Sequence, residues 1–385
     1  MRVLVSGAGI AGPVLAYWLT RRGVDVTVVE RAPTLRDHGG STVSLLPPAL
    51  DISARMSVLA DIEALAAPRP ADVGGGAPGR RVEILRDDLS AIYHAAGRDT
   101  AEYVFGDSVT GIDADGEVTF EKMLARTFDV IVGADGLHST VRHLTFGAAA
   151  EVTRFLGGYV AVVSAPRELA TPGEVVEHVD VGRRAAISTA DHLQDARAVF
   201  LFRAEEQLDD HYGDAAWQRE LLRKVFTGMH PQVDRWLSGI DHSPAWYFDT
   251  ISQLRLDRLS RRRVTLVGDA GYCSGPATGA STSLAVLGAY VLAGELAQSD
   301  GDHLRAFAAY ELAMREPVRL SQGFARNAAR SIMPGSRAAV WASTRGTELV
   351  SRLPAPLART LVTLNGRGVR VHDSMHVPDY PAIDD

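Results

Sequence analysis

The sequence predicts an α/β fold with a parallel sheet, because three short apolar runs that lie far apart in the chain each end in a glycine-containing turn. The runs are residues 3–5, 128–132 and 264–267, and the turns after them contain Gly7, Gly133 and Gly268. Short apolar runs of this kind are typical of strands that are buried on both faces. Ligands of open α/β sheets bind beyond the carboxyl ends of the strands, so we expect the three turns to form one site.

The first run opens the strongest motif in the chain. Residues 1–30 read MRVLVSGAGIAGPVLAYWLTRRGVDVTVVE, which predicts a strand, a glycine turn, a helix and a second strand. In such a motif Gly7 makes the turn, Gly9 lets a pyrophosphate approach the backbone, and Gly12 lets the helix pack on the strand. The anion is expected at the helix N-terminus, where free N–H groups and the helix dipole favour negative charge.

Glu30 ends the second strand, 18 residues after Gly12, and completes a dinucleotide-binding fingerprint. Its carboxylate can accept both hydroxyls of an adenosine ribose and would repel a 2′-phosphate, so we expect FAD or NAD rather than NADP here. Residues 74–79 also match the glycine pattern. We interpret them as a loop, because no apolar strand precedes them and a proline interrupts them.

The remaining patterns predict the other elements in order. Residues 50–65 have helical spacing, residues 82–85 form a strand, and a helix begins at Arg86 with two aspartates in its first turn. Strands are predicted at 103–105, 108–112 and 117–120, with a hairpin turn at Asp115-Gly116. Alternating strands follow at 159–163, 174–178, 184–188 and 198–202, then helices at 217–229, 283–297 and 303–330.

These elements predict a discontinuous Rossmann-like nucleotide-binding domain, a β-sheet substrate domain and C-terminal helices. We expect residues 1–150 and 258–300 to form the two parts of the nucleotide-binding domain. Residues 151–257 are expected to form the β-rich substrate domain, and residues 301–385 a helical cap.

Composition narrows the function classes. The 385 residues are 46% hydrophobic and 23% charged, as in an ordinary globular protein. The formal charge of −7 comes without a long basic run, which makes nucleic acid an unexpected partner. Cys273 is the only cysteine, so an internal disulfide is impossible and a reducing cytoplasm fits. The apolar segment 284–296 is short and interrupted by Glu295, so we expect no membrane insertion.

Three segments carry a resemblance to the single-component FAD-dependent aromatic hydroxylases, the class of para-hydroxybenzoate hydroxylase and of the tetracycline-inactivating monooxygenases. They are GAGIAG with Glu30, DVIVGADGLHSTVR at 129–142, and RVTLVGDAG at 263–271. The resemblance extends over nearly the whole chain. It implies an enzyme that reduces FAD with NAD(P)H, adds O₂ to form a flavin C4a-hydroperoxide, and transfers one oxygen to an aromatic or polyketide-like small molecule.

The resemblance also implies roles for individual residues. Asp269 resembles the aspartate that accepts a hydrogen bond from the ribityl chain, and Arg86 the arginine that meets the FAD phosphates or the ribityl chain. Asp135 resembles the aspartate beside the pyrophosphate and the transient nicotinamide. Alternatively, Arg86 is a solvated residue at a helix start, and Asp135 a turn residue at a strand end. The expected cofactor-binding set is Gly7, Gly9, Ile10, Ala11, Gly12, Glu30, Arg31, Arg86, Val109, Asp135, Gly136, Asp269, Pro276, Gly279, Ala280 and Ser281.

The chain departs from the family in the turn after the third run. The family has Pro-x-x-Gly-x-Gly there, whereas this chain has Pro-Ala-Thr-Gly-Ala-Ser at 276–281, so Ser281 replaces a glycine close to the flavin. We expect the added Cβ to shift the ring or to demand an unusual backbone angle. The following helix is expected to direct its N-terminus toward the flavin pyrimidine edge. The region between residues 65 and 82 is shorter than in the family. It is therefore open whether this chain has the strands that cover the substrate cavity in the family.

Other candidate residues have simpler explanations. Cys273 is expected to be a small buried residue and not a nucleophile, because apolar neighbours raise a thiol pKa. The histidines show no metal-ligand spacing. Four residues could line a substrate pocket, although packing in the core is the favoured interpretation; they are Tyr159, His192, Trp246 and Tyr247. We therefore assign no catalytic side chain.

Several functions stay open at this point. Rivals are a flavin halogenase, whose W-x-W-x-I-P element is absent, a nicotinamide-only dehydrogenase, a reductase-type FAD enzyme, and a catalytically impaired nucleotide-binding protein. Residues 151–257 hold the aromatics Trp236, Trp246, Tyr247 and Phe248 and no basic cluster on one strand. We therefore expect a bulky, largely apolar, aromatic or polycyclic substrate. The protein is expected to be a monomer or a homodimer.

Overall fold

The central element is a six-stranded sheet with the order β15-β16-β9-β1-β2-β5. The computed structural model describes residues 1–35, 42–67, 80–147, 153–208, 214–243, 245–275, 280–351 and 375–381. All neighbouring strands of this sheet are parallel except the β15–β16 pair. The three predicted apolar runs lie side by side as β16, β9 and β1, which confirms that they share one sheet. The bounds are β1 Arg2–Ser6, β2 Asp25–Glu30, β5 Glu102–Phe105, β9 Val130–Gly133, β15 Ser260–Arg261 and β16 Val264–Leu266.

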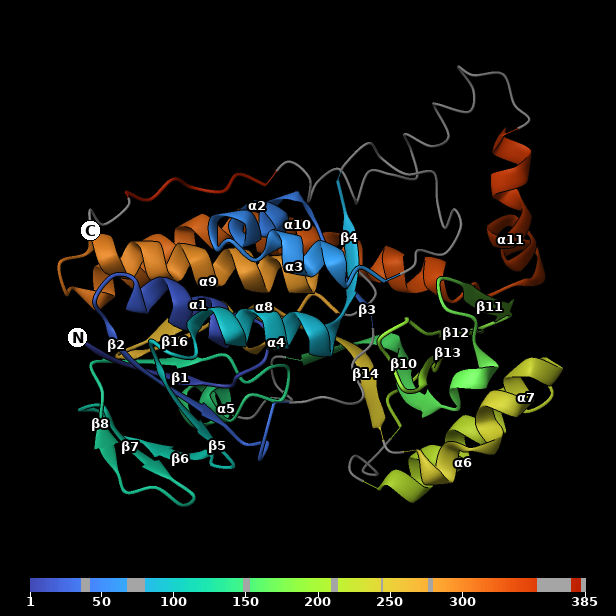
Figure 1. The fold of residues 1–385 in the computed structure, drawn as a ribbon, viewed down its shortest axis with the longest axis horizontal. Helices are drawn as coiled ribbons and strands as arrows, with labels where there is room; N and C mark the ends of the chain where they lie inside the picture. Colours follow the sequence, from blue (N-terminus) through green and yellow to red (C-terminus); the bar gives the residue numbers. More distant parts are fainter. Residues whose placement is uncertain are drawn as a thin grey trace.

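Helices cover one face of this sheet (Figure 1). Val3 and Val5 of β1 pack into the core beneath them, and Leu4 points to the opposite face, as the alternation of a strand requires. Helix α9 is apolar on nearly every side because it packs against α1, α2 and α10. The helices are α1 Ala11–Thr20, α2 Pro47–Arg55, α3 Leu59–Ala64, α4 Arg86–Gly97, α9 Ser281–Gln298 and α10 His303–Ile332.

The other face of the central sheet is covered by a three-stranded antiparallel sheet, β6-β7-β8, and by α5. The predicted turn at Asp115-Gly116 joins β6 to β7, and Gly116 has the positive φ of 92° that such turns need. Leu4 and Ile131 of the central sheet pack against Val118 in this layer. The bounds are β6 Val109–Ile112, β7 Glu117–Phe120, β8 Arg126–Thr127 and α5 Thr140–Phe146.

A second, five-stranded antiparallel sheet has the order β11-β12-β13-β10-β14. Helices α6 and α7 cover one face through Phe226 and Trp236, and the end of α10 meets the other face through Ala329 and Met333. The sheet therefore lies between its own helices and the layers of the central sheet (Figure 1). The bounds are β10 Thr153–Ala165, β11 Val175–Asp180, β12 Arg183–Ser188, β13 Ala196–Arg203, β14 Trp246–Leu254, α6 Ala215–Phe226 and α7 Pro231–Ser238.

Short elements connect these layers. Strands β3 and β4 pair antiparallel, so the chain keeps a two-stranded sheet beside the shortened region at residues 65–82. Residues 375–381 dock on α9, where the Tyr380 hydroxyl donates a hydrogen bond to Glu295 Oε1 at 2.7 Å. The remaining bounds are β3 Thr42–Leu45, β4 Val82–Leu85, α8 Asp269–Tyr272, α11 Arg337–Ser351, and 3-10 turns at Arg167–Leu169 and Ile240–His242.

One sequence prediction needs correction, some elements were not predicted, and one predicted loop lies outside the described residues. Residues 50–65 form two helices instead of one, because Ser57 takes a left-handed conformation with φ 62° between them. Helix α7 and strand β14 were not predicted at all. The glycine-rich residues 74–79 lie outside the described ranges. Within those ranges, no helix combines the length and the apolar character needed to cross a bilayer.

The tight packing of α9 gives a first test. A Cβ added to Gly288 would lie 1.9 Å from Tyr272 Oη, which is buried and hydrogen-bonded by Tyr310. We expect Gly288→Ala to lower the free energy of unfolding by about 1 to 3 kcal/mol through overpacking. In the matched variant Gly323→Ala, the added methyl of α10 meets no atom within 4 Å. This control should gain about 0.5 to 1 kcal/mol from helix propensity.

Urea denaturation of both variants measures the two changes. Equal effects of the two substitutions would contradict the packing that we describe for α9.

Candidate functional site

The first turn of the site has a conformation that only glycine adopts easily. Gly7 has φ 109°, and its N–H donates a 2.7 Å hydrogen bond to Val29 O. A Cβ on Gly7 would lie 2.6 Å from Ala134 O in the loop after β9. The turn after β1 and the loop after β9 are therefore in direct contact, as the shared-site prediction requires.

The other two glycines of the fingerprint differ in what surrounds them. A Cβ on Gly12 would lie 1.9 Å from Gly7 O, so helix α1 can pack on the turn only without a side chain there. A Cβ on Gly9 would meet nothing nearer than Arg86 Nη2, at 4.0 Å. Gly12 thus serves the packing of the fold, whereas Gly9 leaves room beside an arginine.

The N-terminus of α1 presents its N–H groups toward this room. Ile10 occupies the N-cap position and makes no side-chain hydrogen bond to the first turn. Ile10 and Ala11 are buried in the core beneath the helices. The first N–H groups of a helix have no partner within the helix, and Pro13, in the first turn, has no N–H to satisfy. This end of α1 can therefore accept a phosphate.

Glu30 already holds the turn together. Its Oε2 accepts the Ala8 N–H at 2.8 Å and its Oε1 accepts the Ala32 N–H at 2.9 Å. Each carboxylate oxygen has a second acceptor position, so both can still receive a ribose hydroxyl. Arg31 is exposed next to this carboxylate. The arrangement fits the adenosine half of a dinucleotide.

The loop after β9 is braced by its own side chains. Asp135 Oδ1 accepts the Ser139 hydroxyl at 2.5 Å, and Asp135 Oδ2 accepts the Val141 N–H at 3.1 Å. Burial raises the pKa of Asp135, although these hydrogen bonds oppose the rise. The contacts resemble those of a turn residue that caps a helix. Gly136, with φ 81°, has no atom within 4 Å of an added Cβ.

Sequence reasoning missed Arg142, which joins this loop to the third strand end. Its side chain is fully buried, and its guanidinium donates hydrogen bonds to Ala270 O at 2.9 Å and to Leu137 O. Burial lowers the pKa of Arg142. The only signal in the sequence was its place at the end of the quoted motif, which does not reveal burial.

Asp269 follows the third strand, after Gly268 with φ 66°. Burial raises the pKa of Asp269, and the positive charge of Arg86 opposes that rise. Arg86, the first residue of α4, therefore lies near both Gly9 and Asp269, which supports the predicted association of these residues. Cys273 is buried, and burial raises the pKa of its thiol well above the usual range. Its predicted role as a small buried residue agrees with this.

The predicted residues at the start of α9 are only partly described. Ala280 occupies the N-cap position of α9 and is fully buried. Ser281 is the first residue of α9, and its hydroxyl lies 3.0 Å from the Ser274 hydroxyl. Its φ is not positive, so the unusual backbone angle that we expected at Ser281 is not present. Pro276 and Gly279 lie outside the described residues.

Other predicted residues lie away from the turns. The side chain of Val109 is buried in the core between the central sheet and β7, so a contact with a cofactor would have to come from its backbone. Trp246 and Phe248 of β14 lie with Trp236 beneath α6 and α7, and Tyr159 is buried in the same cluster. Tyr159 and Trp246 thus pack in or against this core, as the simpler interpretation predicted, and Trp236 and Phe248 do the same. Only Tyr247 points to the opposite face of the sheet.

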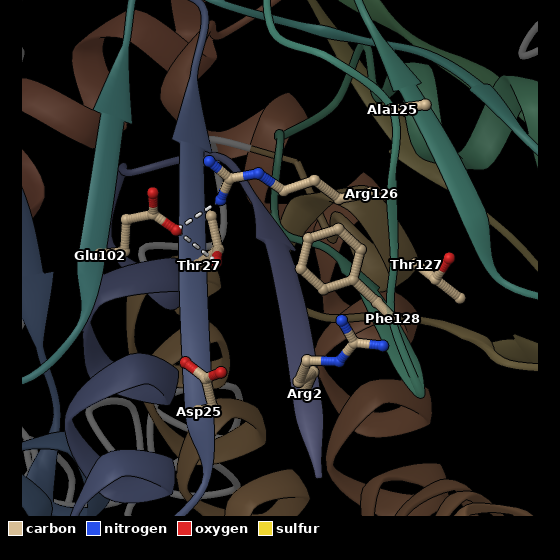
Figure 2. A pocket seen from close by; sticks show the side chains of 8 residues that line it. All are labelled: Arg2, Asp25, Thr27, Glu102, Ala125, Arg126, Thr127 and Phe128. Carbon is tan, nitrogen blue, oxygen red and sulfur yellow. Dashed lines mark hydrogen bonds and ion pairs between the residues drawn. The ribbon is translucent and has the colours of Figure 1, made fainter.

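A cavity of about 460 Å³ lies at the other end of the central sheet. Its lining includes Arg2 and Asp25, which begin the parallel strands β1 and β2, whereas the glycine turns follow the carboxyl ends of strands (Figure 2). In this cavity Arg126 forms an ion pair with Glu102 at 2.7 Å. Among the described residues, no group of His, Cys, Asp and Glu side chains could hold a metal ion.

Comparisons with known proteins agree with this geometry. A family model for the pyridine nucleotide-disulphide oxidoreductases matches residues 2–44. The match covers β1, the glycine turn, α1 and β2, which carry the glycine fingerprint and Glu30. Since Cys273 is the only cysteine of the chain, the match does not extend to an internal redox disulfide.

Two relatives match most of the chain. The uncharacterized protein Rv1260 of Mycobacterium tuberculosis is 38% identical over 334 residues, which cover 80% of this chain and 88% of that protein. A flavin-dependent monooxygenase of Legionella longbeachae is 30% identical over 348 residues, which cover 84% of this chain and 87% of that protein. The crystal structure of the tetracycline destructase Tet(51) is also similar, with a TM-score of 0.82 and 29% identity, and the match covers 98% of this chain and 99% of that one.

The contrast between Gly9 and Gly12 gives a second test. Because the space beside Gly9 is open, Gly9→Ala should change the free energy of unfolding of the FAD-free protein by less than about 0.5 kcal/mol. The methyl group would occupy the approach of the pyrophosphate, so FAD affinity should fall at least about tenfold, or 1.4 kcal/mol. Flavin fluorescence titration measures the affinity.

The control is Gly12→Ala, whose methyl would collide with Gly7 O. It should lower the free energy of unfolding by about 1 to 3 kcal/mol even without FAD. Unchanged FAD binding by Gly9→Ala would mean that the pyrophosphate does not lie at this turn.

Proposed function

Because this chain belongs to the flavin-dependent monooxygenases of the single-component FAD hydroxylase type, we propose that it uses NAD(P)H and O₂ to insert one oxygen atom into an aromatic or polycyclic small molecule. For each turnover, substrate, O₂, NAD(P)H and one proton give the hydroxylated product, NAD(P)⁺ and water. FAD, when bound, supplies the electron transfer and the activation of O₂. The protein binds, orients and shields the reactants.

The observation that carries the proposal is the open space at Gly9. It lies between the uncapped N-terminus of α1 and the Arg86 guanidinium, two residues after Gly7, where the turn meets the loop after β9. A phosphate group placed there would receive helix N–H groups and a positive charge together. Gly9 thus combines steric freedom with the electrostatics that a pyrophosphate needs.

Three groups of this chain are proposed to hold the rest of the cofactor. Glu30 accepts the ribose hydroxyls with its two remaining acceptor positions. Asp269 accepts a hydroxyl of the ribityl chain, and its proximity to Arg86 keeps a positive charge near that carboxyl. The N-terminus of α9, at Ala280 and Ser281, favours negative charge at the pyrimidine edge of the flavin.

The electron donor is proposed to bind transiently. The chain has one dinucleotide fingerprint in its full strand–turn–helix context, and FAD occupies it. The sequence therefore offers a nicotinamide nucleotide no second fingerprint. We propose that the nucleotide binds near the flavin only while it reduces the flavin.

A bulky and largely neutral substrate is proposed from the sheet face that bears Tyr247. That face carries the apolar residues Val160, Val162 and Ile251, which pack against Ala329 and Met333 at the end of α10. Arg184, on the same face of β12, forms an ion pair with Glu177 at 2.6 Å, so its charge is already compensated. The similar tetracycline destructase is named for a polycyclic compound, which supports the same substrate class.

The alternative is a catalytically impaired FAD-binding protein. Ser281 favours it, since a side chain stands where the family has glycine close to the flavin. The ordinary helical start at Ser281 removes the backbone part of that argument. A protein that binds FAD but never oxidises NAD(P)H in the presence of any tested substrate would favour this alternative.

The third prediction concerns Asp269. Asp269→Asn keeps the shape of the side chain but removes the charge, so it should weaken FAD binding by about 1.5 to 3 kcal/mol, the usual contribution of a hydrogen bond to a charged group. The matched control is Asp25→Asn, which makes the same change in the cavity at the opposite end of the sheet (Figure 2). Titration of each purified variant with FAD measures the affinities. A loss with Asp25→Asn and none with Asp269→Asn would place the ligand in that cavity instead.

The fourth prediction concerns the reaction. NAD(P)H consumption by the FAD-loaded protein should rise when a polycyclic polyketide is added, and the product should gain the mass of one oxygen. Small hydroxybenzoates should give neither effect, because Arg184 on the proposed face is already paired with Glu177 and does not clamp a carboxylate. Stimulation by the small acids alone would refute the proposed substrate class.

A further inference from the structure

One chain of hydrogen bonds crosses from the surface to the interior beside the site. His138, in the loop after β9, places Nε2 3.0 Å from Asp249 Oδ2 on β14. The side chain of His138 is 62% exposed, whereas that of Asp249 is 6% exposed. A carboxylate inside the protein is therefore in direct contact with an imidazole that reaches solvent.

The same carboxylate oxygen accepts a second donor. The Tyr247 hydroxyl donates to Asp249 Oδ2 at 3.2 Å, from two residues earlier on β14 and therefore from the same face. The other oxygen, Oδ1, accepts the Thr250 N–H at 2.7 Å. The backbone thus fixes the carboxylate in place, while its Oδ2 contacts two groups that can exchange protons.

The inner end of this chain lies among the charged groups of the proposed FAD site. Burial raises the pKa of Tyr247, the negative charges of Asp249 and Asp269 add to the rise, and the positive charge of Arg86 opposes it. These charges come from β14, α8 and α4. Tyr247 is therefore hydrogen-bonded to Asp249 and lies within reach of the charges of Arg86 and Asp269, which we assign to the cofactor.

We propose that His138, Asp249 and Tyr247 form a proton relay between solvent and the interior of the FAD site. The inference rests on the proposed function, because that reaction takes up one proton for each turnover and a dry site must receive it from outside. Imidazole is the side chain best suited to exchange protons near neutral pH. The three groups are relay residues, and none of them is assigned a direct role in oxygen transfer.

Each step of the relay moves one proton and no electrons. A proton from water binds Nδ1 of His138 as the proton on Nε2 passes to Asp249 Oδ2. The Tyr247 hydroxyl turns from Asp249 toward the site, its proton passes to an acceptor there, and the Tyr247 oxygen takes the new proton from Asp249. Tyr247 then donates to Asp249 Oδ2 again. Water gives a proton to Nε2 of His138 as Nδ1 releases its own, which restores the starting arrangement.

The test measures exchange of the Tyr247 hydroxyl proton with solvent, through the deuterium isotope shift of ¹³Cζ-labelled tyrosine in the FAD-bound protein. His138→Gln retains a hydrogen-bond donor beside Asp249 but cannot carry a proton. It should slow the exchange at least tenfold. His138→Ala should slow the exchange of the Tyr247 hydroxyl proton as well. Imidazole added at about 50 mM should restore the rate, because His138 is exposed and a free imidazole can reach its place.

The matched control is His192→Gln. His192 also pairs with an aspartate, through Nε2 to Asp88 Oδ2 at 2.8 Å, but that pair lies on α4 and the β12–β13 connection. This variant should leave the exchange of the Tyr247 hydroxyl unchanged. FAD affinity should stay within twofold of the parent in all three variants, which separates proton transfer from a structural effect.

Exchange that is equally fast in His138→Gln, or a loss in His138→Ala that imidazole does not restore, would overturn the relay. The measurement needs no substrate, so its failure is distinct from failure of the proposed reaction. Where turnover is found, the solvent deuterium isotope effect on kcat should increase in His138→Gln while KM stays constant.

Discussion

The structure depends on the close contact between helix α1 and the turn that precedes it. A side chain at Gly12 would lie 1.9 Å from Gly7 O, so the helix and the turn can meet only because Gly12 lacks one. Strand β1 pairs with β2 on one side and β9 on the other, which places this contact at the centre of the sheet. Its geometry therefore sets the position of Gly9, of Glu30 at the end of β2, and of the loop after β9.

Buried polar groups join the other segments to this centre. Arg142 binds two carbonyl oxygens, one from its own loop and one from α8, and thereby links the second strand end to the third. A buried guanidinium is costly unless it is hydrogen-bonded, so the two loops are held at the distance that its fork allows. Asp249 serves a similar purpose between the two sheets, because it lies on β14 and contacts His138 from the loop after β9.

This arrangement separates the tasks of the two sheets. The central sheet supplies the proposed cofactor site with glycine turns, the N-terminus of α1 and the carboxylates of Glu30 and Asp269. The second sheet presents apolar side chains on the face that bears Tyr247, and Arg184 on that face is paired with Glu177. A proposed proton relay at the junction of the two sheets connects the polar cofactor site to solvent without opening the apolar face.

The sequence alone determined the features that depend on local chemistry. The glycine fingerprint with Glu30 predicted β1, α1 and β2, and three apolar runs predicted strands that lie side by side. Positions whose backbone must approach another group closely permit only glycine, so such sites can be recognised in one sequence. The resemblance of the quoted motifs to FAD hydroxylases is confirmed by relatives that match most of the chain.

Only the tertiary structure decided the features that depend on distant partners. Strand β14 was missed because Asp249, Thr250, Ser252 and Gln253 are buried polar residues that remove the apolar signal of a strand. Their hydrogen bonds come partly from segments far away in the chain, such as His138 and the Gln322 carbonyl oxygen. Arg142 and Tyr247 were not assigned for the same reason: the sequence states which groups are present, but the burial and the partners that define their chemistry exist only in the folded chain.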